Sequence, residues 1–338
     1  GGLVAATTGG AVFWATDGTH AKVTAADGLC ANWLTDVAVA ADGEAWFATI
    51  DGGLCGRDAL GRWHHLNPTT PGPLERETAL WAVAADADGW WASGGLGALL
   101  LLENGRWTRQ SLPAPLAGAD VDDLAVAPDG SLWVVASSDG ALAARRSRDG
   151  RWRVWSQADG LPAAAQGRRL AVDVSGDVWI GALNYGEAAR FGRDGRWHAV
   201  DWYDGGPIAA DPSGGVWTAA VTWHDENGDF ADDLVVRHAA GEDAPTTFVW
   251  ANQFEGSQAT AIVADGSGGT WIGTDGRGLV HLSAGGTWSR RGCGDPVPDN
   301  QPVAVAFGPD GSAWMAYNSA LFTGVVRRDA AGAWTPLP

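Results

Sequence analysis

The sequence predicts an all-β fold, a β-propeller built from four-stranded sheets, which we call blades. Three observations lead to this prediction. A unit of short strands and tight turns repeats along the chain with a period of about 45 residues, which is typical of propeller blades. The 338 residues include 49 Gly and 21 Trp, which suit many turns and large side chains between neighbouring sheets. No long segment has the period of a helix.

The clearest copy of the unit reads as a meander of four strands. Residues 36–40 and 45–49 are expected to form the first two strands. Asp42-Gly43 lies between them, because Asp-Gly readily adopts the positive φ that a two-residue hairpin turn needs. Residues 54–57 follow as the third strand, and residues 61–64 begin the fourth. Such a sheet is apolar on both faces, so stacking against similar sheets is needed to cover it.

The number of blades follows from a Gly-x-x-Trp turn that precedes the second strand. Two variants belong to the series, since Gly10 is followed by Phe13-Trp14 and Gly89 runs directly into Trp90-Trp91. The regular copies are Gly43/Trp46, Gly130/Trp133, Gly176/Trp179, Gly214/Trp217, Gly268/Trp271 and Gly311/Trp314. Together they predict eight second strands and therefore eight blades.

The two ends of the chain decide how the blades are counted. Residues 1–28 hold three strand-like segments and are expected to form a short first blade. Residues 29–338 then form seven repeats of about 45 residues, the last with its own outer strand at residues 333–335. The sequence thus predicts a single propeller over residues 1–338. Seven blades remain the alternative if residues 1–28 are an accessory piece.

Charge and hydropathy argue against a nucleic-acid partner and against a membrane span. The formal net charge of −18 would repel phosphate backbones, so no nucleic-acid partner is expected. No apolar run of about 18 residues occurs, so no membrane span is expected. The chain begins Gly-Gly without Met, and we expect a mature or excised soluble piece.

Three cysteines are too few for a disulfide scaffold. Cys30 and Cys55 lie in one unit and could pair; otherwise both are small buried residues. Cys293 is single in either case.

One run of the chain carries a family resemblance. Residues 26–37 read Ala-Asp-Gly-Leu-Cys-Ala-Asn-Trp-Leu-Thr-Asp-Val, and residues 49–54 continue the unit as Thr-Ile-Asp-Gly-Gly-Leu. Residues 159–162 repeat the opening as Asp-Gly-Leu-Pro, and residues 271–279 repeat the second half. These motifs resemble the two-component regulator propeller repeat. The resemblance implies a propeller that binds or senses a ligand outside the cytoplasm, often fused to a signalling module.

Two enzyme families share smaller parts of the unit. The streptogramin lyase propellers have a similar Gly-x-x-Trp-Phe turn, and sialidase-type propellers share the tail Gly-Thr-Trp, found at residues 269–271. No His and Glu arrangement of the lyases carries over to this sequence residue by residue. We therefore assign no catalytic residue, and whether the protein is an enzyme stays open.

Candidate ligand-binding residues lie where the unit varies. In a four-stranded blade, the loops between second and third strands and the crossings between blades share one face, and here that face is varied. Its aromatic, carboxylate and amide side chains suit a sugar or a peptide. Trp33 and Trp81 have an alternative interpretation as wedges between blades. The candidates are Trp33, Asp51, Trp81, Asp122, Arg168, Tyr185, Tyr203, His224, Arg277, Asn300 and Tyr317.

An acidic loop at residues 225–233 predicts a calcium site. Calcium takes six to eight oxygen ligands, and the spacing resembles the calcium hairpin of integrin-type propellers. Phe230 departs from that pattern, which has Gly at this position. The alternative is a solvated acidic hairpin without metal. On the pattern, the ligands are the side chains of Asp225, Asn227, Asp229 and Asp233 and the carbonyl of Ala231.

The sequence favours an extracellular or periplasmic module that binds a carbohydrate or peptide through its varied face. A lyase- or glycosidase-type enzyme is the first alternative, and converging carboxylates with one raised pKa would favour it. The second alternative is a structural or assembly subunit that docks to partner proteins. An exposed apolar patch around Trp155, Trp202 or Trp250 would favour that alternative.

Overall fold

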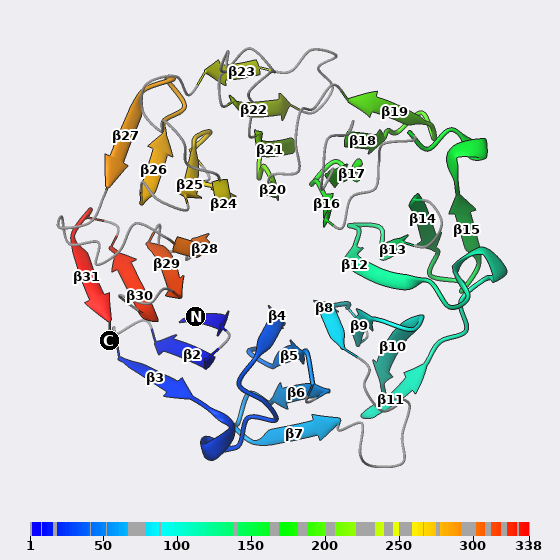
Figure 1. The fold of residues 1–338 in the computed structure, drawn as a ribbon, viewed down its shortest axis with the longest axis horizontal. Coiled ribbons are helices and arrows are strands. Elements are labelled where there is room, and N and C mark those ends of the chain that lie inside the picture. Colours follow the sequence, from blue (N-terminus) through cyan, green and yellow to red (C-terminus); the bar gives the residue numbers. More distant parts are fainter. Residues whose placement is uncertain are drawn as a thin grey trace, which may run out of the picture. The chain divides into compact units, whose positions relative to one another are not determined.

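The computed structural model describes residues 2–7, 9–15, 19–40, 42–51, 53–66, 79–87, 89–137, 141–162, 169–181, 188–200, 207–220, 234–239, 246–249, 259–265, 267–274, 278–291, 302–307, 312–318, 323–329 and 331–337. These residues form eight consecutive antiparallel sheets, and the chain is an all-β, eight-bladed propeller. The strands of every sheet are hydrogen-bonded in chain order (Figure 1). The predictions of fold class and of eight blades are confirmed.

The chain divides into two compact units, Gly1–Leu161 and Pro162–Pro338, which are described separately. The boundary falls between the fourth and fifth blades, so every repeat stays intact. In unit 1 the first blade is β1 (Gly2–Thr7), β2 (Gly10–Ala15) and β3 (His20–Val23). The second is β4 (Leu34–Val39), β5 (Ala45–Thr49), β6 (Leu54–Arg57) and β7 (Trp63–Leu66), and the third is β8 (Leu80–Ala85), β9 (Trp90–Gly94), β10 (Ala98–Glu103) and β11 (Arg106–Arg109). The fourth is β12 (Asp120–Val126), β13 (Leu132–Ser137), β14 (Ala141–Arg146) and β15 (Trp152–Trp155).

Unit 2 contains four further four-stranded blades. They are β16 (Arg169–Val172), β17 (Val178–Gly181), β18 (Ala188–Phe191) and β19 (Trp197–Val200); β20 (Ile208–Ala210), β21 (Gly215–Ala220), β22 (Leu234–Ala239) and β23 (Thr246–Val249); β24 (Ala259–Ala264), β25 (Thr270–Thr274), β26 (Leu279–Leu282) and β27 (Trp288–Arg291); and β28 (Pro302–Phe307), β29 (Ala313–Asn318), β30 (Thr323–Arg328) and β31 (Trp334–Leu337).

The first and last blades differ in their number of strands. The first is a three-stranded sheet, as expected for a short blade made from residues 1–28. The last takes its outer strand, β31, from its own repeat. Helix is confined, among the described residues, to three 3-10 turns: η1 (Ala25–Asp27), η2 (Ala114–Leu116) and η3 (Gln157–Asp159). No helix in the described ranges is long and apolar enough to cross a membrane.

Second strands are deeply buried where neighbouring sheets of the same unit cover both of their faces. All five residues of β5 and of β9 are buried. In unit 1, Trp46 of β5 packs with Trp90 of β9 and Leu100 of β10 in one apolar cluster. In unit 2, Trp217 of β21 packs with Ile272 of β25 in a similar cluster. The repeated tryptophan therefore fills the space between blades, as the sequence pattern predicted.

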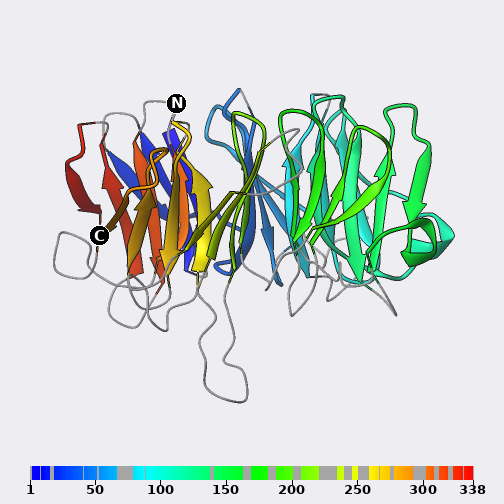
Figure 2. The same cartoon turned by 90° about the horizontal axis from the view of Figure 1, so that it is seen from above.

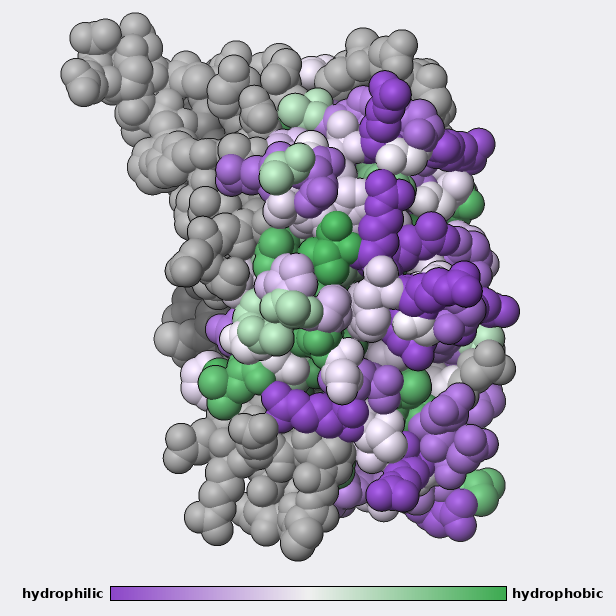
Figure 3. Space-filling view, turned by 90° about the vertical axis from the view of Figure 1, so that its right-hand side faces the viewer, coloured by the Kyte–Doolittle hydropathy of each residue, from purple (hydrophilic) through white to green (hydrophobic). Residues whose placement is uncertain are grey.

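Each blade has two edges with different connections (Figure 2). The turn edge carries the turns between first and second strands and between third and fourth strands. The loop edge lies opposite and carries the loops between second and third strands and the crossings between blades. The described surface seen in Figure 3 is mostly hydrophilic, with apolar residues between the polar ones.

Candidate functional site

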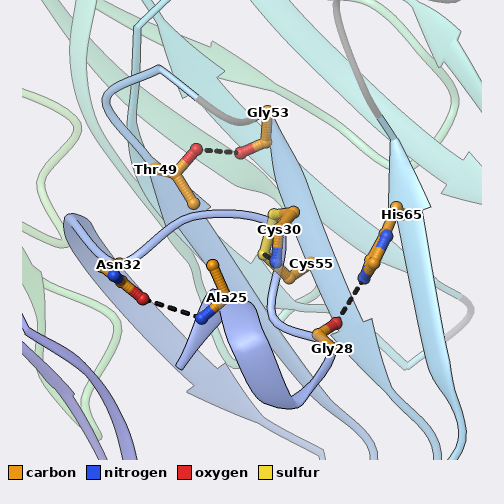
Figure 4. The surroundings of a disulfide bond; sticks show 8 residues. All are labelled: Ala25, Gly28, Cys30, Asn32, Thr49, Gly53, Cys55 and His65. Carbon is orange, nitrogen blue, oxygen red and sulfur yellow. Dashed lines mark hydrogen bonds between the residues drawn. A yellow bond between two sulfur atoms is a disulfide. The ribbon is translucent and has the colours of Figure 1, made fainter. Parts of the chain in front are cut away.

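The loop edge of unit 1 begins with a crossing that is pinned by a disulfide. Cys30, in the crossing from the first to the second blade, is bonded to Cys55 of β6 (Figure 4). The Oδ1 atom of Asn32 accepts a hydrogen bond from the backbone N of Ala25 at 2.7 Å. The structure thus has these two cysteines paired, which is the first of the two interpretations that the sequence left open. Trp33 follows in the same crossing, three residues after the disulfide-bonded Cys30.

The Asp-Gly-Leu motif that opens this crossing has a physical reason. Asp27 ends the 3-10 turn η1 and accepts hydrogen bonds from the backbone and hydroxyl of Thr24. These bonds hold the pKa of Asp27 below its ordinary value. Gly28 adopts φ 108°, a left-handed conformation that favours glycine, and Leu29 is buried. The second copy, Asp159-Gly160-Leu161 at the end of η3, is built in the same way.

Trp33 and the β5–β6 loop form an exposed corner. The side chain of Trp33 is 53% exposed, and that of Ile50 is 38% exposed. The backbone N of Ile50 donates a hydrogen bond to the carbonyl of Trp33 at 3.3 Å, which places the crossing beside the loop. Asp51 follows directly and is exposed. The exposure of Trp33 removes its alternative interpretation as a buried wedge.

A β-bulge positions the next candidates. The register of first and second strands shifts at the start of β4, β8 and β12, so one residue of each first strand is unpaired. These residues are Thr35, Trp81 and Asp122, and bulges of this kind redirect side chains. The hydroxyl of Thr35 donates to the carbonyl of Leu80 at 2.7 Å and so connects two bulges. Two of the predicted residues therefore occupy equivalent places in neighbouring blades.

The β9–β10 loop presents an apolar side chain that sequence reasoning missed. Leu96 is 55% exposed and has φ 56°, which is uncommon for a residue other than glycine. Two charged side chains hold its backbone. Its N–H donates to Oδ1 of Asp120 at 2.9 Å, and its carbonyl accepts from Nη2 of Arg109 at 2.7 Å. A Leu enclosed by Gly94, Gly95 and Gly97 is the signal in the sequence that could have revealed this loop.

Close packing beneath Leu96 explains the glycines around it. A Cβ at Gly94 would overlap the carbonyl oxygen of Ala79, so only glycine fits there. The ring of Trp81 lies under the loop, since an ideal Cβ at Gly95 would be 3.6 Å from its Cζ2 atom. Trp81 is half-buried in consequence. Trp33 and Asp51 thus lie along the loop edge of the second blade, and Trp81 and Leu96 along that of the third. The hydrogen bond from Thr35 to Leu80 connects the two blades.

Two predicted ligand-binding residues are withdrawn from the surface. Tyr317 is fully buried, in a cluster with Trp271 and Met315, so the expectation that it contacts a ligand is wrong. The loop position predicted an exposed side chain, but the end of β29 packs against Trp271 and Leu279 of the preceding blade. Asp122, the unpaired residue of the β12 bulge, is only 7% exposed. The remaining candidates, Arg168, Tyr185, Tyr203, His224, Arg277 and Asn300, lie outside the described residues.

The predicted metal ligands also lie outside the described residues. These are Asp225, Asn227, Asp229, Ala231 and Asp233. Within the described ranges, no group of three or more His, Cys, Asp or Glu side chains could hold a metal ion. The calcium site stays a prediction.

Of the three tryptophans outside the blade pattern, the structure describes Trp155. Trp155 is only 2% exposed and stacks on Trp133, with ring centroids 5.3 Å apart and planes 10° apart. Trp155 therefore does not contribute to the exposed patch that would favour an assembly subunit, because its ring packs on Trp133. Trp202 and Trp250 lie outside the described residues.

The turn edge, in contrast, carries a repeated brace. Asp211 accepts hydrogen bonds from the backbone N and the hydroxyl of Ser213. It also accepts from Nε1 of Trp217 and Nε of Arg237, both at 2.9 Å. Burial raises the pKa of Asp211, but the bonds from Ser213 and the charge of Arg237 outweigh it, and the pKa lies below its ordinary value. The carboxylate therefore stays ionised and binds three parts of the blade together.

The brace recurs because third strands place a cation opposite the tryptophan. Arg237 pairs with Trp217 across the two strands, and its guanidinium carbon lies 5.5 Å from the ring centroid. Such a contact is a cation–π interaction. The other arginine pairs are Trp133 with Arg145, Trp179 with Arg190 and Trp314 with Arg327. In the seventh blade the ring of His281 stacks on Trp271 at the same place.

His238, at the turn edge of β22, is buried and uncharged at neutral pH. Its ring centroid lies 5.2 Å from that of Trp179. Burial lowers the pKa of His238 to about 4, and the charge of Arg190 adds to this effect. The carboxylates with resolved shifts in the described ranges, such as Asp211 and Asp265, have lowered pKa values. Lowered values are typical of carboxylates that accept hydrogen bonds in a structural role.

No protein-family model and no curated protein matches the sequence. Several solved structures share the fold. A streptogramin B lyase is 14% identical with a TM-score of 0.61, covering 90% of this chain and 93% of that one. PorZ, a surface component of the type-IX secretion system of Porphyromonas gingivalis, is 14% identical with a TM-score of 0.59, covering 99% of this chain and 43% of that one. YCF48 from Cyanidioschyzon merolae is 15% identical with a TM-score of 0.58, covering 84% and 92%.

Extracellular domains of hybrid two-component systems of B. thetaiotaomicron also match, with TM-scores of 0.41 and 0.37. At these identities the comparisons show the fold alone. The resemblance to the two-component regulator propeller repeat therefore rests on the sequence motifs.

Proposed function

We propose that this chain is an extracellular or periplasmic module that binds an extended peptide segment of a protein partner at the loop edge of unit 1. One observation carries the proposal: two large apolar side chains, Trp33 and Leu96, are more than half exposed on supports that hold them rigidly. A disulfide and a backbone hydrogen bond position the first, and Asp120 and Arg109 position the second. Exposed anchors that are ordered before binding lower the entropy that binding loses.

The disulfide supports the proposed compartment. Disulfides persist in oxidising environments and are rare in the cytosol. PorZ, which shares the fold, is a bacterial surface component.

Peptide is favoured over carbohydrate by the apolar character of the anchors. Ile50 and Leu96 offer no hydrogen bond to a sugar hydroxyl from their side chains, whereas both suit apolar side chains of a peptide. YCF48, another protein of this fold, has been solved with a D1 peptide bound. Carbohydrate is the second ligand class, and the test below includes it.

A binding screen tests the proposal. The purified chain is screened against a peptide array and an oligosaccharide panel, together with Leu96→Asn and Leu60→Asn. Asn tolerates the positive φ of residue 96 and removes the apolar side chain. Leu60 is 78% exposed at the turn edge and serves as the matched control. We expect peptides to bind, Leu96→Asn to weaken binding about tenfold, and Leu60→Asn to leave it unchanged. Binding of sugars alone, or equal effects of both variants, would contradict the proposal.

We also propose that calcium orders the hairpin at residues 225–233. The support is the spacing of oxygen-bearing side chains in the sequence. Calcium at a hundred times its dissociation constant should stabilise the folded chain by about 2.7 kcal/mol. We expect EDTA to lower the thermal midpoint of the wild-type protein and not of Asp229→Asn. An unchanged midpoint of the wild-type protein in EDTA would remove calcium from the proposal.

A further inference from the structure

We infer that Trp33 and Asp51 form the subsite for an arginine side chain of the bound peptide. The inference rests on the proposed function and names the chemistry that one corner of the loop edge recognises.

The braces show how this chain binds a guanidinium. In the sixth blade, an aromatic face and a carboxylate surround Arg237. The guanidinium lies over Trp217 and donates to Asp211, which is bonded to the same indole. A planar cation is suited to both interactions at once, since it stacks on an aromatic ring and donates from its edge.

The loop-edge corner offers the aromatic face and the carboxylate of a brace, but the described residues supply no guanidinium to it. Trp33 offers an indole that is 53% exposed, and Asp51 offers an exposed carboxylate. The hydrogen bond from Ile50 to the carbonyl of Trp33 brings the two segments together, and Asp51 is the next residue. In the described part of the chain, no arginine lies over Trp33 or pairs with Asp51. A partner can supply the missing cation.

Charge favours a cationic group over the alternatives. The chain has a net charge of −18, so its field attracts cations and repels anions. Arg109, the basic side chain beside Leu96, is already bonded to the carbonyl of that residue. Ile50 and Leu96 flank the corner with exposed apolar surface. The expected ligand is therefore a segment with an arginine next to apolar residues.

A positional-scanning library of acetylated decapeptides, with every residue except Cys at each position, tests the inference. Binding to the wild-type chain is compared with Trp33→Ala, Trp33→Phe and Asp51→Asn. The matched controls at the turn edge are Leu60→Ala and Glu103→Gln, which change an exposed apolar side chain and an exposed carboxylate. The wild-type protein should enrich arginine at one position, and both controls should retain that enrichment.

The selected peptide is then resynthesised with citrulline or lysine in place of that arginine. Citrulline keeps the shape and loses the charge. We expect about tenfold weaker binding for citrulline and about threefold for lysine, because lysine keeps the charge without the planar fork. Trp33→Ala should abolish this discrimination, Trp33→Phe should keep part of it, and Asp51→Asn should weaken the arginine peptide about threefold at low salt.

The outcomes separate the two proposals. Peptides that bind without arginine enrichment, or an enrichment that survives in Trp33→Ala and Asp51→Asn, would overturn the arginine subsite and leave the peptide-binding function intact. A library in which no peptide binds would overturn the proposed function itself. Arginine enrichment that only the loop-edge variants remove would support both.

Discussion

The two edges of the blades use the same residue types for opposite purposes. At the turn edge, Trp217 is 1% exposed and its indole nitrogen is bonded to Asp211. At the loop edge, Trp33 is 53% exposed on a crossing held by a disulfide. The first tryptophan stabilises the interface between blades, and the second leaves its surface available to a partner. The same side chain is structural or functional according to what surrounds it.

The difference also explains why one edge repeats and the other varies. Each brace closes within its own blade, as Asp211, Trp217 and Arg237 do in the sixth, so it can recur from one blade to another. The loop edge has no such requirement, because its loops project from strands that are already held together. Four predictions test this contrast, from the largest expected effect to the smallest.

Removing a buried tryptophan from the turn edge should have the largest effect. Trp217→Ala leaves a cavity between two blades and removes a partner of Asp211, so we expect a loss of about 3–5 kcal/mol in the free energy of unfolding. Urea denaturation measures it. Trp33→Ala is the control and should change this free energy by less than about 0.5 kcal/mol. Equal losses in the two variants would abolish the distinction between the edges.

Opening the disulfide should have a nearly equal effect at the loop edge. It closes a loop with a sequence separation of 25 residues. Its loss should lower the free energy of unfolding by about 3–4 kcal/mol, largely through the unfolded chain. Calorimetry of Cys30→Ala/Cys55→Ala, with and without dithiothreitol, measures this change. Reductant should lower the midpoint of the wild-type chain to that of the double variant and leave the double variant unchanged.

Acid should destabilise unit 2 through His238. Burial lowers the pKa of this imidazole to about 4, whereas an unfolded chain has the ordinary value of 6.5. As the pH falls below 6.5, the unfolded state binds a proton, whereas the folded state stays unprotonated until the pH nears 4. Stability should therefore fall by up to about 3 kcal/mol between pH 6.5 and pH 4.

The pH dependence of His238→Leu isolates this group. Between pH 7 and pH 5 the lowered carboxylates stay ionised in the folded state, so most of their contribution is lost at lower pH. His238→Leu should lose less stability over this interval than the wild-type chain, in urea denaturation at both values. His198→Asn, at an exposed site, is the control. If His238→Leu loses as much stability between pH 7 and pH 5 as the wild-type chain, this imidazole is not the titrating group.

The smallest effect on stability is expected at the loop-edge tip. Leu96→Asn removes an exposed side chain and keeps the backbone bonds to Asp120 and Arg109. The free energy of unfolding should change by less than about 0.5 kcal/mol, while peptide binding weakens. Urea denaturation and binding of the same preparation measure the two effects. A loss of stability as large as that of Trp217→Ala would make Leu96 a structural residue.

Much of the fold was predictable because it depends on local chemistry that repeats. The Gly-x-x-Trp turns predicted the second strands β5, β13, β17, β21, β25 and β29. The three segments of residues 1–28 predicted the short first blade. Turn and strand preferences act over a few residues, so the chain alone determines them. Asp27-Gly28-Leu29 is a further case, since its 3-10 turn, left-handed glycine and buried leucine lie within six residues of Thr24.

The candidate site was predictable only in part. Trp33, Asp51 and Trp81 were found because aromatic and acidic residues stand out in variable loops. Tyr317 satisfied the same criterion and is buried, and Leu96 did not satisfy it and is exposed. Exposure depends on which strand of a neighbouring blade lies over a side chain, and residues distant in the sequence decide that.

The sequence by itself determined that this protein is built from repeated antiparallel blades, because period, turns and tryptophans are properties of each repeat. Tertiary structure decided which tryptophan faces solvent, that Cys30 meets Cys55, and that Asp120 and Arg109 hold Leu96 outward. These features depend on distances between separate segments. Packing sets such distances only after the blades have formed.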